Sequence, residues 1–550
     1  MSLETALTHE EGVKAASHLL RGHLGEDLAD GARALSHPDS EHLIKFHGIY
    51  AQDDRDVRRE RTLAKEELEY IFMVRVVVPG GRLTSAQWLA LDDVAERFGN
   101  GTLRLTTRQT VQIHGVWKGS LRDLARRLHE ATLSSFGGCG DVVRNTVLCP
   151  RLGEDPYYAR LVTTIASHFR ARTNAYLEVF VNGEIAVSVE DESEHDFYGV
   201  TYLPRKFKIA VAHPEENCVD VFAHDVGIIP TEHPTEGRGA HVLIGGGLGR
   251  SYQHPGTYAR LAESLGFVRE EDLVPVIQSL VEIYRDEGGR VDRRQARFKY
   301  VVAERGVDQI REEVVRRSGR VVVDAPAPLL APGDDHLGWR PGSDGRSWLG
   351  LPVPRGRVRD AESSSLRGAL RQIAETLDVQ FVVTPRQDLR VGVAPELCAE
   401  IDRRVSGAGV TSAEDLSPVA RRAIACVALP TCSKALAESE RVLPEVLAIV
   451  DGALTRVGRS NHPLEVRVSG CPNGCSRAAL AEVALVGRTK TTYDLYLGAS
   501  PRGDRLARLV AEKVSLDHLD ATLAPWLTRW AQEGAPGESF GDFVARTDQA

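Results

Sequence analysis

Two distant segments of this 550-residue chain repeat the same order of local patterns, and this repeat restricts the folds open to it. The first segment passes from the turn Pro79-Gly80-Gly81 through a helical stretch to Arg108-Gln109. The second passes from Pro354-Arg355-Gly356 through another helical stretch to Arg386-Gln387, at nearly the same spacing. Unrelated αβ units can share one such feature by coincidence, but turn, helix and Arg-Gln pair agree here in order. We therefore expect two strand–helix–strand halves, joined by the proline-rich, semi-rigid linker 324–335.

The first half shows the pattern in detail. The apolar run that begins at Tyr70 predicts a strand carrying Arg75, and residues 85–99 predict a helix. Residues 103–116 alternate like a half-buried strand, so we expect one strand there, with Arg104 and Arg108 on it. The first sixty residues are charged and look helical.

Composition excludes several classes of protein. The chain has 68 Lys and Arg against 77 Asp and Glu, a net charge of −9, which argues against a general binder of nucleic acid or anionic membranes. No apolar run reaches the 18–20 or so residues of a membrane span. The N-terminus has no basic and apolar leader pattern, so the expected compartment is the cytosol, where a disulfide framework is not expected.

The eight cysteines are unevenly spread along the chain. Four are scattered, and four crowd together as Cys426-x5-Cys432 and Cys471-x3-Cys475. Four thiolates from two loops suit a tetrahedral zinc or an iron–sulfur cluster. Structural zinc prefers pairs two to four residues apart, which the first pair does not match, so the spacing favours a cluster. Buried cysteines without a metal are the third interpretation.

Basic residues gather in a few segments of this acidic protein. Lys206 and Lys208 alternate on an apparent strand, so both side chains are expected on one face, where they repel unless an anion lies between them. A solvated basic face is the ordinary explanation for any single arginine. Together on apolar strands, the basic residues indicate a polyanionic ligand; they are Arg75, Arg104, Arg108, Arg144, Arg205, Lys206, Lys208, Arg290, Arg293, Arg294, Arg297 and Lys299. The glycines of 245–249 lack the last glycine of a dinucleotide motif and are expected to form a turn close to a large ligand.

With these residues in place, the chain resembles the siroheme-dependent sulfite/nitrite reductase family, and in particular its sulfite reductase hemoprotein subunits. The resemblance covers nearly the whole length. It runs through FHGIYAQDDRDVRRER, RLTTRQTVQIHGV, GDVVRNTVLC, YLPRKFK, GGRVDRRQARFKY, the two cysteine motifs and SFGDF.

The resemblance implies an α+β fold of three αβ domains with a pseudo-twofold repeat and the cofactors at the domain junction. An N-terminal helical or extended segment is expected over 1–61. Paired ferredoxin-like half-domains are expected over 62–135 and 345–415. A first siroheme and substrate domain is expected over 136–335, and a second siroheme and iron–sulfur domain over 416–550.

The resemblance also assigns cofactors and residues. Cys426, Cys432, Cys471 and Cys475 would bind a [4Fe-4S] cluster, and Cys475 would also be the axial ligand of the siroheme iron. The substrate anion would be held by Arg75, Arg144, Lys206 and Lys208. Asn473 would pack beside the macrocycle, and its carboxylates would be bound by Arg104, Arg108, Arg205, Arg290, Arg293 and Lys299.

The implied reaction is the six-electron reduction of sulfite to sulfide. Nitrite-preferring relatives typically have Asn at the position of Lys208, so this lysine favours sulfite. A nitrite reductase is the first alternative, and a non-catalytic zinc or iron–sulfur scaffold is the second. Converging cations argue against a scaffold, which has no use for them.

Two further expectations follow from the resemblance. Some relatives carry a cysteine at the position of Cys139 that is joined covalently to a tyrosine, and Tyr50 is the candidate partner here; an ordinary thiol is the alternative. The chain contains no recognisable flavin or NADP module, so electrons must come from a partner protein. An NADPH-dependent flavoprotein reductase and a ferredoxin are both candidates.

Overall fold

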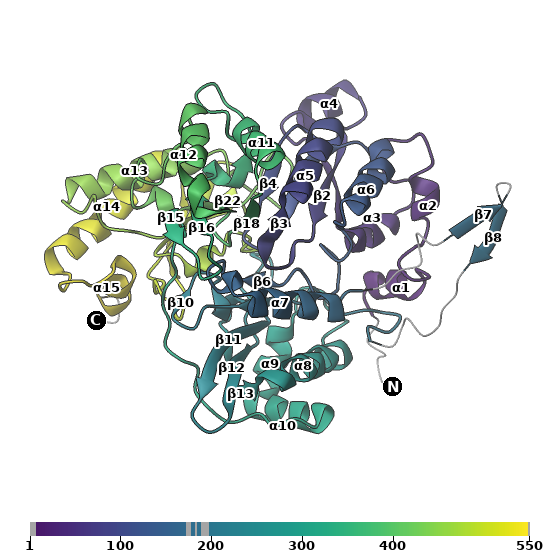
Figure 1. Cartoon of the computed structure of the whole chain (residues 1–550), viewed down its shortest axis with the longest axis horizontal. Helices are drawn as coiled ribbons and strands as arrows, with labels where there is room; N and C mark the ends of the chain where they lie inside the picture. Colours follow the sequence, from purple (N-terminus) through teal and green to yellow (C-terminus); the bar gives the residue numbers. More distant parts are fainter. Residues whose placement is uncertain (1–6, 172–177, 182–183, 189–196, 548–550) are drawn as a thin grey trace.

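The computed structural model describes residues 7–171, 178–181, 184–188 and 197–547 (Figure 1). Its α-helices are α1 (His9–Ala15), α2 (Leu24–Asp27), α3 (Ser40–Leu43), α4 (Arg58–Ala64), α5 (Ser85–Phe98), α6 (Leu121–Glu130), α7 (Pro156–His168), α8 (Leu273–Glu287), α9 (Phe298–Arg305), α10 (Val307–Ser318), α11 (Leu366–Thr376), α12 (Cys398–Gly407), α13 (Leu443–Arg456), α14 (Leu516–Glu533) and α15 (Phe540–Thr547). No helix among the described residues is long and apolar enough to cross a membrane.

Within the described ranges, the strands form four five-stranded sheets and two small ribbons. Two of the sheets make up the paired half-domains. The first has the order β1 (Ile49–Asp53), β2 (Tyr70–Val76), β5 (Val111–Val116), β4 (Leu103–Leu105) and β17 (Arg357–Val358). The second has the order β15 (Gly338–Pro341), β16 (Ser347–Leu351), β19 (Leu389–Val393), β18 (Gln380–Val383) and β3 (Arg82–Thr84).

The two half-domains exchange their short strands. β3 belongs to the first repeat but pairs with β18 of the second, whereas β17 of the second repeat pairs with β4 of the first. Both of these pairings are antiparallel, and each exchanged strand directly follows the turn that the repeat shares. The predicted duplication is therefore confirmed. The exchange ties the two halves into one unit.

The same unusual backbone angles recur at equivalent positions of the two copies. Gly80 and Arg355 both have positive φ, at 61° and 58°, inside the shared turn. Gln109 and Gln387 also have positive φ, at 55° and 74°, a region that a side chain with a Cβ rarely adopts. Such angles are maintained only where the surroundings require them. Here Gly80 and Arg355 close the shared turns 79–81 and 354–356, and Gln109 and Gln387 close the turns that carry the two Arg-Gln pairs.

The expectation of a single strand over residues 103–116 was wrong. Residues 103–116 form two antiparallel strands, β4 and β5, and not a single strand. Arg104 lies on β4, but Arg108 lies in the turn between the strands. The polar run 106–110 interrupts the alternation, but it contains no glycine, proline or asparagine that would mark a turn. Gln109 at positive φ provides the reversal without the usual glycine or asparagine.

The other two sheets, called the first and the second outer sheet below in chain order, also repeat each other. One has the order β6 (Val147–Leu148), β9 (Ile209–Val211), β11 (Val226–His233), β12 (Gly237–Ile244) and β13 (Glu263–Arg269). The other has the order β20 (Ile424–Ala425), β21 (Val466–Ser469), β22 (Val483–Thr489), β23 (Thr492–Leu497) and β24 (Arg508–Val514). In both, the first two pairings are parallel and the last two are antiparallel. The duplication thus extends to the whole αβ framework.

The elements gather into three lobes (Figure 1). β11–β13 with α8–α10 form the lower lobe, α13–α15 lie on the left, and α5, α6 and α11 lie at the top. One apolar core extends from the N-terminal region through the half-domains and the lower lobe, and a second fills the 419–544 region. The small ribbons are β7 (Glu178–Val181) with β8 (Glu184–Ser188), and β10 (Glu216–Asn217) with β14 (Ala331–Pro332).

Two strands fall outside the domain limits expected from sequence. β1 lies within 1–61, yet it pairs along its whole length with β2. β15 lies before residue 345, yet it pairs with β16. Both extend the sheets of the paired half-domains, because an open edge strand gains a ladder of backbone hydrogen bonds when a neighbouring segment joins it.

Candidate active site

The four clustered cysteines lie at the ends of parallel strands. Cys426 directly follows β20, with Cys432 in the loop after it, and Cys471 and Cys475 lie in the turn after β21. Because β20 and β21 are parallel neighbours, both loops leave the sheet at the same edge. Burial raises the pKa of Cys426 and of Cys471 to about 12, and the next contribution in each case comes from the neighbouring Cys475 thiol. Cys432 responds to Cys475 in the same way, so the four thiols converge.

Hydrogen bonds between side chains and backbone groups hold this cysteine group in place. The Gly470 N–H donates to the Sγ of Cys426 at 3.2 Å. Arg55 donates to the carbonyl oxygens of Cys432 and Ala435, at 3.2 and 2.6 Å. The Thr107 hydroxyl donates to the carbonyl oxygen of Cys475 at 3.1 Å. The N-terminal region, the first half-domain and the second outer sheet therefore meet at this turn.

The glycine segment 245–249 lies against the turn between Cys471 and Cys475. The Arg250 N–H donates to the Pro472 carbonyl at 3.0 Å. A Cβ added to Gly249 would lie 3.3 Å from the Asn473 carbonyl oxygen, and one added to Gly474 would lie 3.3 Å from Leu248. Asn473 and Cys475 themselves are exposed. The two loops, one from each outer sheet, therefore pack backbone to backbone beside exposed polar groups, as a turn close to a large ligand requires.

Lys206 and Lys208 lie on an extended segment that leads into β9. Phe207 between them is buried and bridges Val143 in parallel fashion, so the two lysine side chains lie on the opposite face. No hydrogen-bond partner for either ammonium group lies among the described residues. Burial, followed by Arg205 and Arg297, lowers the pKa of Lys206 to about 7, while the Cys475 thiol acts in the opposite direction. Burial and then Lys206 lower the pKa of Lys208 well below its ordinary value.

Arg75 and Arg144 complete the set predicted to bind the substrate. Arg75 donates to the Cys139 sulfur at 3.3 Å and to the Thr110 hydroxyl at 3.0 Å. Burial disfavours its charge, but Cys139, Tyr50 and then Cys475 raise its pKa. Arg144 uses its guanidinium to hold the loop before it, donating to the carbonyls of Gly138 and Gly140. Arg75 and Lys206 thus both lie within electrostatic range of Cys475.

Of the six predicted carboxylate partners, Arg108 is the one whose contacts call most clearly for an anion. Its Nε and Nη1 are buried and have no hydrogen-bond partner, while Nη2 donates to the carbonyl of Asn145. Burial, and then the nearby Arg144, lower its pKa to about 9. A buried guanidinium with two unsatisfied N–H groups is costly unless a ligand supplies acceptors.

The other five already have protein partners. Arg104 donates to Glu440 and to the Ala425 carbonyl, so its charge is matched inside the protein. Arg290 and Arg293 turn towards the N-terminal region, where they pair with Glu11 and with Asp141 respectively. The remaining two contact backbone or carboxylate groups: Lys299 the carbonyls of Gly247, Gly249 and Tyr258, and Arg205 the carboxylate of Asp141 at 3.9 Å.

Two residues of the site, Asp225 and Arg477, were not singled out from sequence, and Arg297 was named only as one member of the basic run 290–299. Arg297 donates to both oxygens of Asp225, and its Nε has no partner. Asp225 also accepts from the backbone N–H of Lys208 at 2.9 Å. Arg477 lies two residues after Cys475 and binds Asp220 at 2.8 Å. The basic run 290–299 pointed to the right segment, but which of its arginines faces inward depends on the folded pairing.

Comparison with known proteins agrees with this geometry. A protein of Chromohalobacter salexigens named sulfite reductase (NADPH) hemoprotein beta-component is 43% identical over 98% of this chain and 94% of its own length. Proteins with the same name from Methylobacterium sp. strain 4-46 and Staphylococcus saprophyticus are 42% and 38% identical, each over 98% of this chain and over 90% and 95% of their own lengths. The chain belongs to the sulfite reductase hemoprotein family.

Two family profiles match parts of the chain. The profile "Nitrite/Sulfite reductase ferredoxin-like half domain" matches residues 64–131, and "Nitrite and sulphite reductase 4Fe-4S domain" matches residues 139–322. The second match covers the first outer sheet, whereas the four clustered cysteines lie in the second, which has the same strand order. The structure of the Mycobacterium tuberculosis NirA protein has the same fold, with a TM-score of 0.79, 23% identity and coverage of 98% of this chain and 96% of that one.

The cofactors of the family, siroheme and a [4Fe-4S] cluster, fit the residues present. Four converging thiols from two parallel-strand loops provide the donor set of a cluster. The exposed Cys475 lies next to a basic region with unsatisfied donors, above all the buried Nε and Nη1 of Arg108. A carboxylate-rich macrocycle supplies the acceptors that this region lacks.

Proposed function

We propose that this chain is the hemoprotein component of an NADPH-dependent sulfite reductase and reduces sulfite to sulfide. The observation that carries the proposal is the position of Cys475. It belongs to the group of four thiols and also lies within electrostatic range of Arg75 and Lys206. A metal-binding cysteine beside converging cations suits the reduction of a small oxyanion and has no purpose in a structural scaffold.

Siroheme and the cluster, when bound, would relay the electrons of the donor protein and provide the iron at which sulfur is reduced. We assign Cys426, Cys432, Cys471 and Cys475 to the cluster, and Cys475 would also help to hold the siroheme. Arg108 and Arg297, which have unpartnered donors, are the residues we assign first to the macrocycle carboxylates. We assign Asn473 to a position beside the macrocycle. Arg104, Arg290 and Arg293 act in our proposal through their protein partners, by holding the surrounding loops.

The substrate anion has two kinds of cation around it. Lys206 and Lys208 have no hydrogen-bond partner among the described residues and are therefore placed to donate directly to the sulfite oxygens. The guanidinium of Arg144 holds the Gly138–Gly140 loop, and that of Arg75 contacts Cys139 and Thr110, so these arginines contribute charge and shape. Such preorganised donors stabilise the negative charge that builds up on oxygen as the S–O bonds break.

Each oxygen of sulfite leaves as water and needs protons. A pKa of about 7 makes Lys206 a suitable acid at neutral pH, because a general acid works best when its pKa is close to the operating pH. Arginine does not release a proton under these conditions. We therefore assign proton delivery to Lys206 and Lys208, and binding to the arginines.

We infer from the names of the relatives that the electron donor is a flavoprotein partner that oxidises NADPH. A ferredoxin is the alternative donor. Nitrite is the alternative substrate, because the matched family profiles carry the names of both reactions. Comparing turnover on sulfite and nitrite with each donor separates these cases.

The test is the absorption spectrum of protein purified from cells able to make siroheme. We expect a Soret band and the long-wavelength band of an isobacteriochlorin, both shifted by sulfite or cyanide. Colourless protein, or protein with only broad iron–sulfur absorption after full cofactor supply, would leave a scaffold and refute the enzyme.

Cys475→Ser tests the bridging position directly. We expect sulfite reduction to fall below detection and the siroheme signal to lose its coupling to the cluster. Cys398→Ser is the matched control, because Cys398 is a half-buried thiol at the start of α12, outside this site. Full turnover in Cys475→Ser would contradict the assignment.

A further inference from the structure

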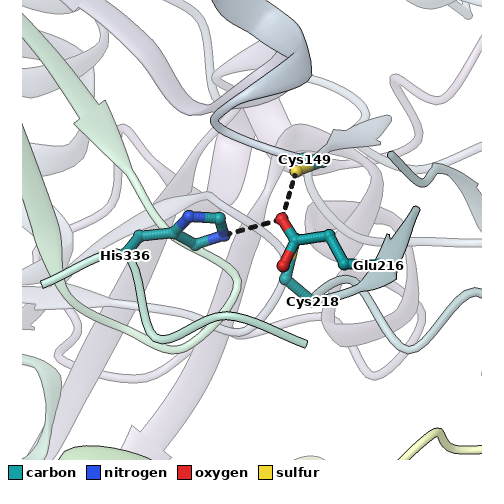
Figure 2. A group of neighbouring side chains, drawn as sticks. All are labelled: Cys149, Glu216, Cys218 and His336. Atoms are coloured by element: carbon teal, nitrogen blue, oxygen red, sulfur yellow. Dashed lines mark hydrogen bonds and ion pairs between the residues drawn. The ribbon is translucent and has the colours of Figure 1, made fainter. Parts of the chain in front are cut away.

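A second group of metal-binding side chains lies outside the active site (Figure 2). It consists of Cys149, Glu216, Cys218 and His336, each offering one ligand atom, and these atoms all lie within 4.8 Å of one another. Figure 2 shows Cys149 and His336 approaching the carboxylate of Glu216 from two other segments of the chain, with Cys218 on the same segment as Glu216. All four are buried, with exposed fractions of 0%, 5%, 1% and 3% respectively.

The separations between these atoms match a single metal ion. The Cys149 Sγ and His336 Nε2 lie 3.4 and 3.8 Å from the same oxygen, Oε1 of Glu216. Zinc bonds of about 2.0–2.3 Å in a tetrahedron place neighbouring ligand atoms about 3.3–3.8 Å apart. The ligand atoms are too close together to surround a four-iron cube, whose thiolates attach to its outer corners. The geometry therefore suits a mononuclear site.

The hydrogen bonding leaves this site incomplete without a ligand. His336 Nε2 is buried, faces Glu216 and has no hydrogen-bond partner. The other oxygen of Glu216, Oε2, is already used, since it accepts from the Asp334 N–H at 2.6 Å. Burial lowers the pKa of His336 to about 3, so its imidazole is neutral, which is the form that binds metals.

The repeat relates this group to the cysteines of the active site. Cys149 follows β6 and donates its N–H to the carbonyl of Val211 in β9, and Cys426 follows β20 and donates in the same way to Val468 in β21. Cys218 lies seven residues after Val211, as Cys475 lies seven residues after Val468.

The residues after these two cysteines confirm the correspondence. Asp220 and Arg477 each lie two residues further on, have φ of 53° and 58°, and precede equivalent 3-10 turns, Val221–Ala223 and Ala478–Leu480. Two of the four cluster cysteines therefore have counterparts in the first copy. Glu216 and His336 complete the group in the first copy.

We propose that Cys149, Cys218, Glu216 and His336 bind one zinc ion. Two thiolates, an imidazole and a carboxylate are the donor types that zinc takes in closed, four-coordinate structural sites. Two thiolates and a carboxylate carry one more negative charge than the ion neutralises. Arg386 lies close enough to lower the pKa of both Cys218 and His336, against the effect of burial on the thiol, and so supplies a balancing positive charge.

The position of His336 gives the zinc a structural role. His336 lies on the segment that joins the two halves of the repeat, between β14 and β15, whereas the other three ligands belong to the first outer sheet and its loops. This segment already pairs with β10 in parallel, and a Cβ on Gly333 would lie 2.6 Å from the Cα of Cys218. A zinc ion here fastens the connecting segment to the first outer domain. This role does not depend on the substrate of the enzyme.

Metal analysis of the holoprotein tests the proposal. The protein is purified from cells supplied with iron, zinc and siroheme, dialysed against a chelator, and analysed for zinc by mass spectrometry. We expect about one zinc per chain in the wild type and in the control Cys398→Ser. The double variant C149S/C218S and the single variant His336→Gln should lose zinc at least tenfold, with iron and siroheme contents unchanged.

X-ray absorption at the zinc edge of the wild type keeps the proposal testable if the double variant does not fold. We expect two sulfur ligands at about 2.3 Å and two lighter ligands at about 2.0 Å. A shell of four sulfurs would place zinc at the cluster cysteines and overturn the proposal. Wild-type holoprotein without zinc would also overturn it and leave a buried, hydrogen-bonded group, as would retention of zinc in both Cys149/Cys218 and His336 variants.

Discussion

Asp225 accepts two hydrogen bonds from Nη2 of Arg297, at 3.0 and 2.8 Å, and its carboxylate is completely buried. The same carboxylate accepts from the backbone N–H of Lys208. Burial, Lys206, Arg297 and Arg108 lower the pKa of Lys208, and Asp225 opposes them. One carboxylate thus holds an arginine in place and favours the charged form of the neighbouring lysine.

Asp225→Asn should therefore shift the pH dependence of turnover. If protonated Lys208 delivers protons to the bound substrate, its pKa in the complex sets the alkaline limit of kcat. Removing a neighbouring negative charge lowers that pKa, so the alkaline limit should move to lower pH, by about one unit. The measurement is kcat for sulfite against pH, and an unmoved alkaline limit would argue against Lys208 as the acid. Asp292→Asn, which removes the carboxylate partner of the exposed Arg294, is the matched control.

Two substitutions of Lys206 separate binding from proton delivery. Lys206→Met removes a charged donor from the substrate anion and should lower kcat/KM for sulfite roughly tenfold to a hundredfold. Lys206→Arg keeps the charge but removes the group with a pKa of about 7, so KM should recover while kcat stays low. Steady-state kinetics with an artificial electron donor measures both constants. Lys45→Met, a lysine paired with Glu41 outside the site, is the control. An unchanged KM in Lys206→Met would show that this lysine does not hold the substrate.

The sequence predicted the framework better than the connections within it. The repeat was visible because turn chemistry is local: proline and glycine mark the tight turns at 79–81 and 354–356. The exchange of β3 and β17 between the sheets was not visible, since strand pairing depends on distant residues. The turn at Gln109 was missed because the polar run 106–110 that forms it contains no glycine, asparagine or proline.

The same difference between local signals and contacts of distant residues holds for the site. The cysteine spacing favoured a cluster and pointed to its four candidate cysteines from local sequence alone, and this assignment stays a prediction. The basic run 290–299 did not show that Arg290 turns towards Glu11 and Arg293 towards Asp141, because the paired residues are 279 and 152 positions apart in the chain. The proposed zinc ligands have no spacing signal either. Three segments contribute them, and these meet only when β6, β9 and β10 are in place.

The proximity of Tyr50 and Cys139 makes a covalent bond between them testable. Burial raises the pKa of Tyr50 to about 12, and the next contribution comes from the Cys139 thiol. The resemblance noted in the sequence predicts a thioether between the two side chains, which lowers the mass of the chain by two hydrogen atoms. Intact mass and peptide mapping of the active holoprotein measure this directly, with Cys139→Ser as the control. Recovery of both unmodified peptides in full would contradict the bond.

Asp141 links the N-terminal region to the loop 138–144, which carries Arg144, and its substitution should destabilise the fold. Its carboxylate lies 2.7 Å from Arg293 and 3.7 Å from both Lys14 and His42, and its side chain is 2% exposed. Burial alone would raise its pKa, but Arg293, Lys14 and Arg205 outweigh burial and lower it to about 2. Asp141→Asn leaves these buried cations without their counter-charge, which typically costs about 3–5 kcal/mol.

The pH dependence of this effect has a definite sign. Because the pKa of Asp141 is lower in the folded state than its ordinary value of 3.8, the stabilisation is complete above about pH 4 and is lost as the pH falls towards 2. We expect the melting temperature of Asp141→Asn to lie roughly 5 °C or more below that of the wild type at pH 7. The difference should shrink below pH 4. Asp308→Asn, which breaks an exposed ion pair with Arg311, should change the melting temperature little. A difference between Asp141→Asn and wild type that stays constant down to pH 2 would show that the carboxylate charge is not what stabilises this junction.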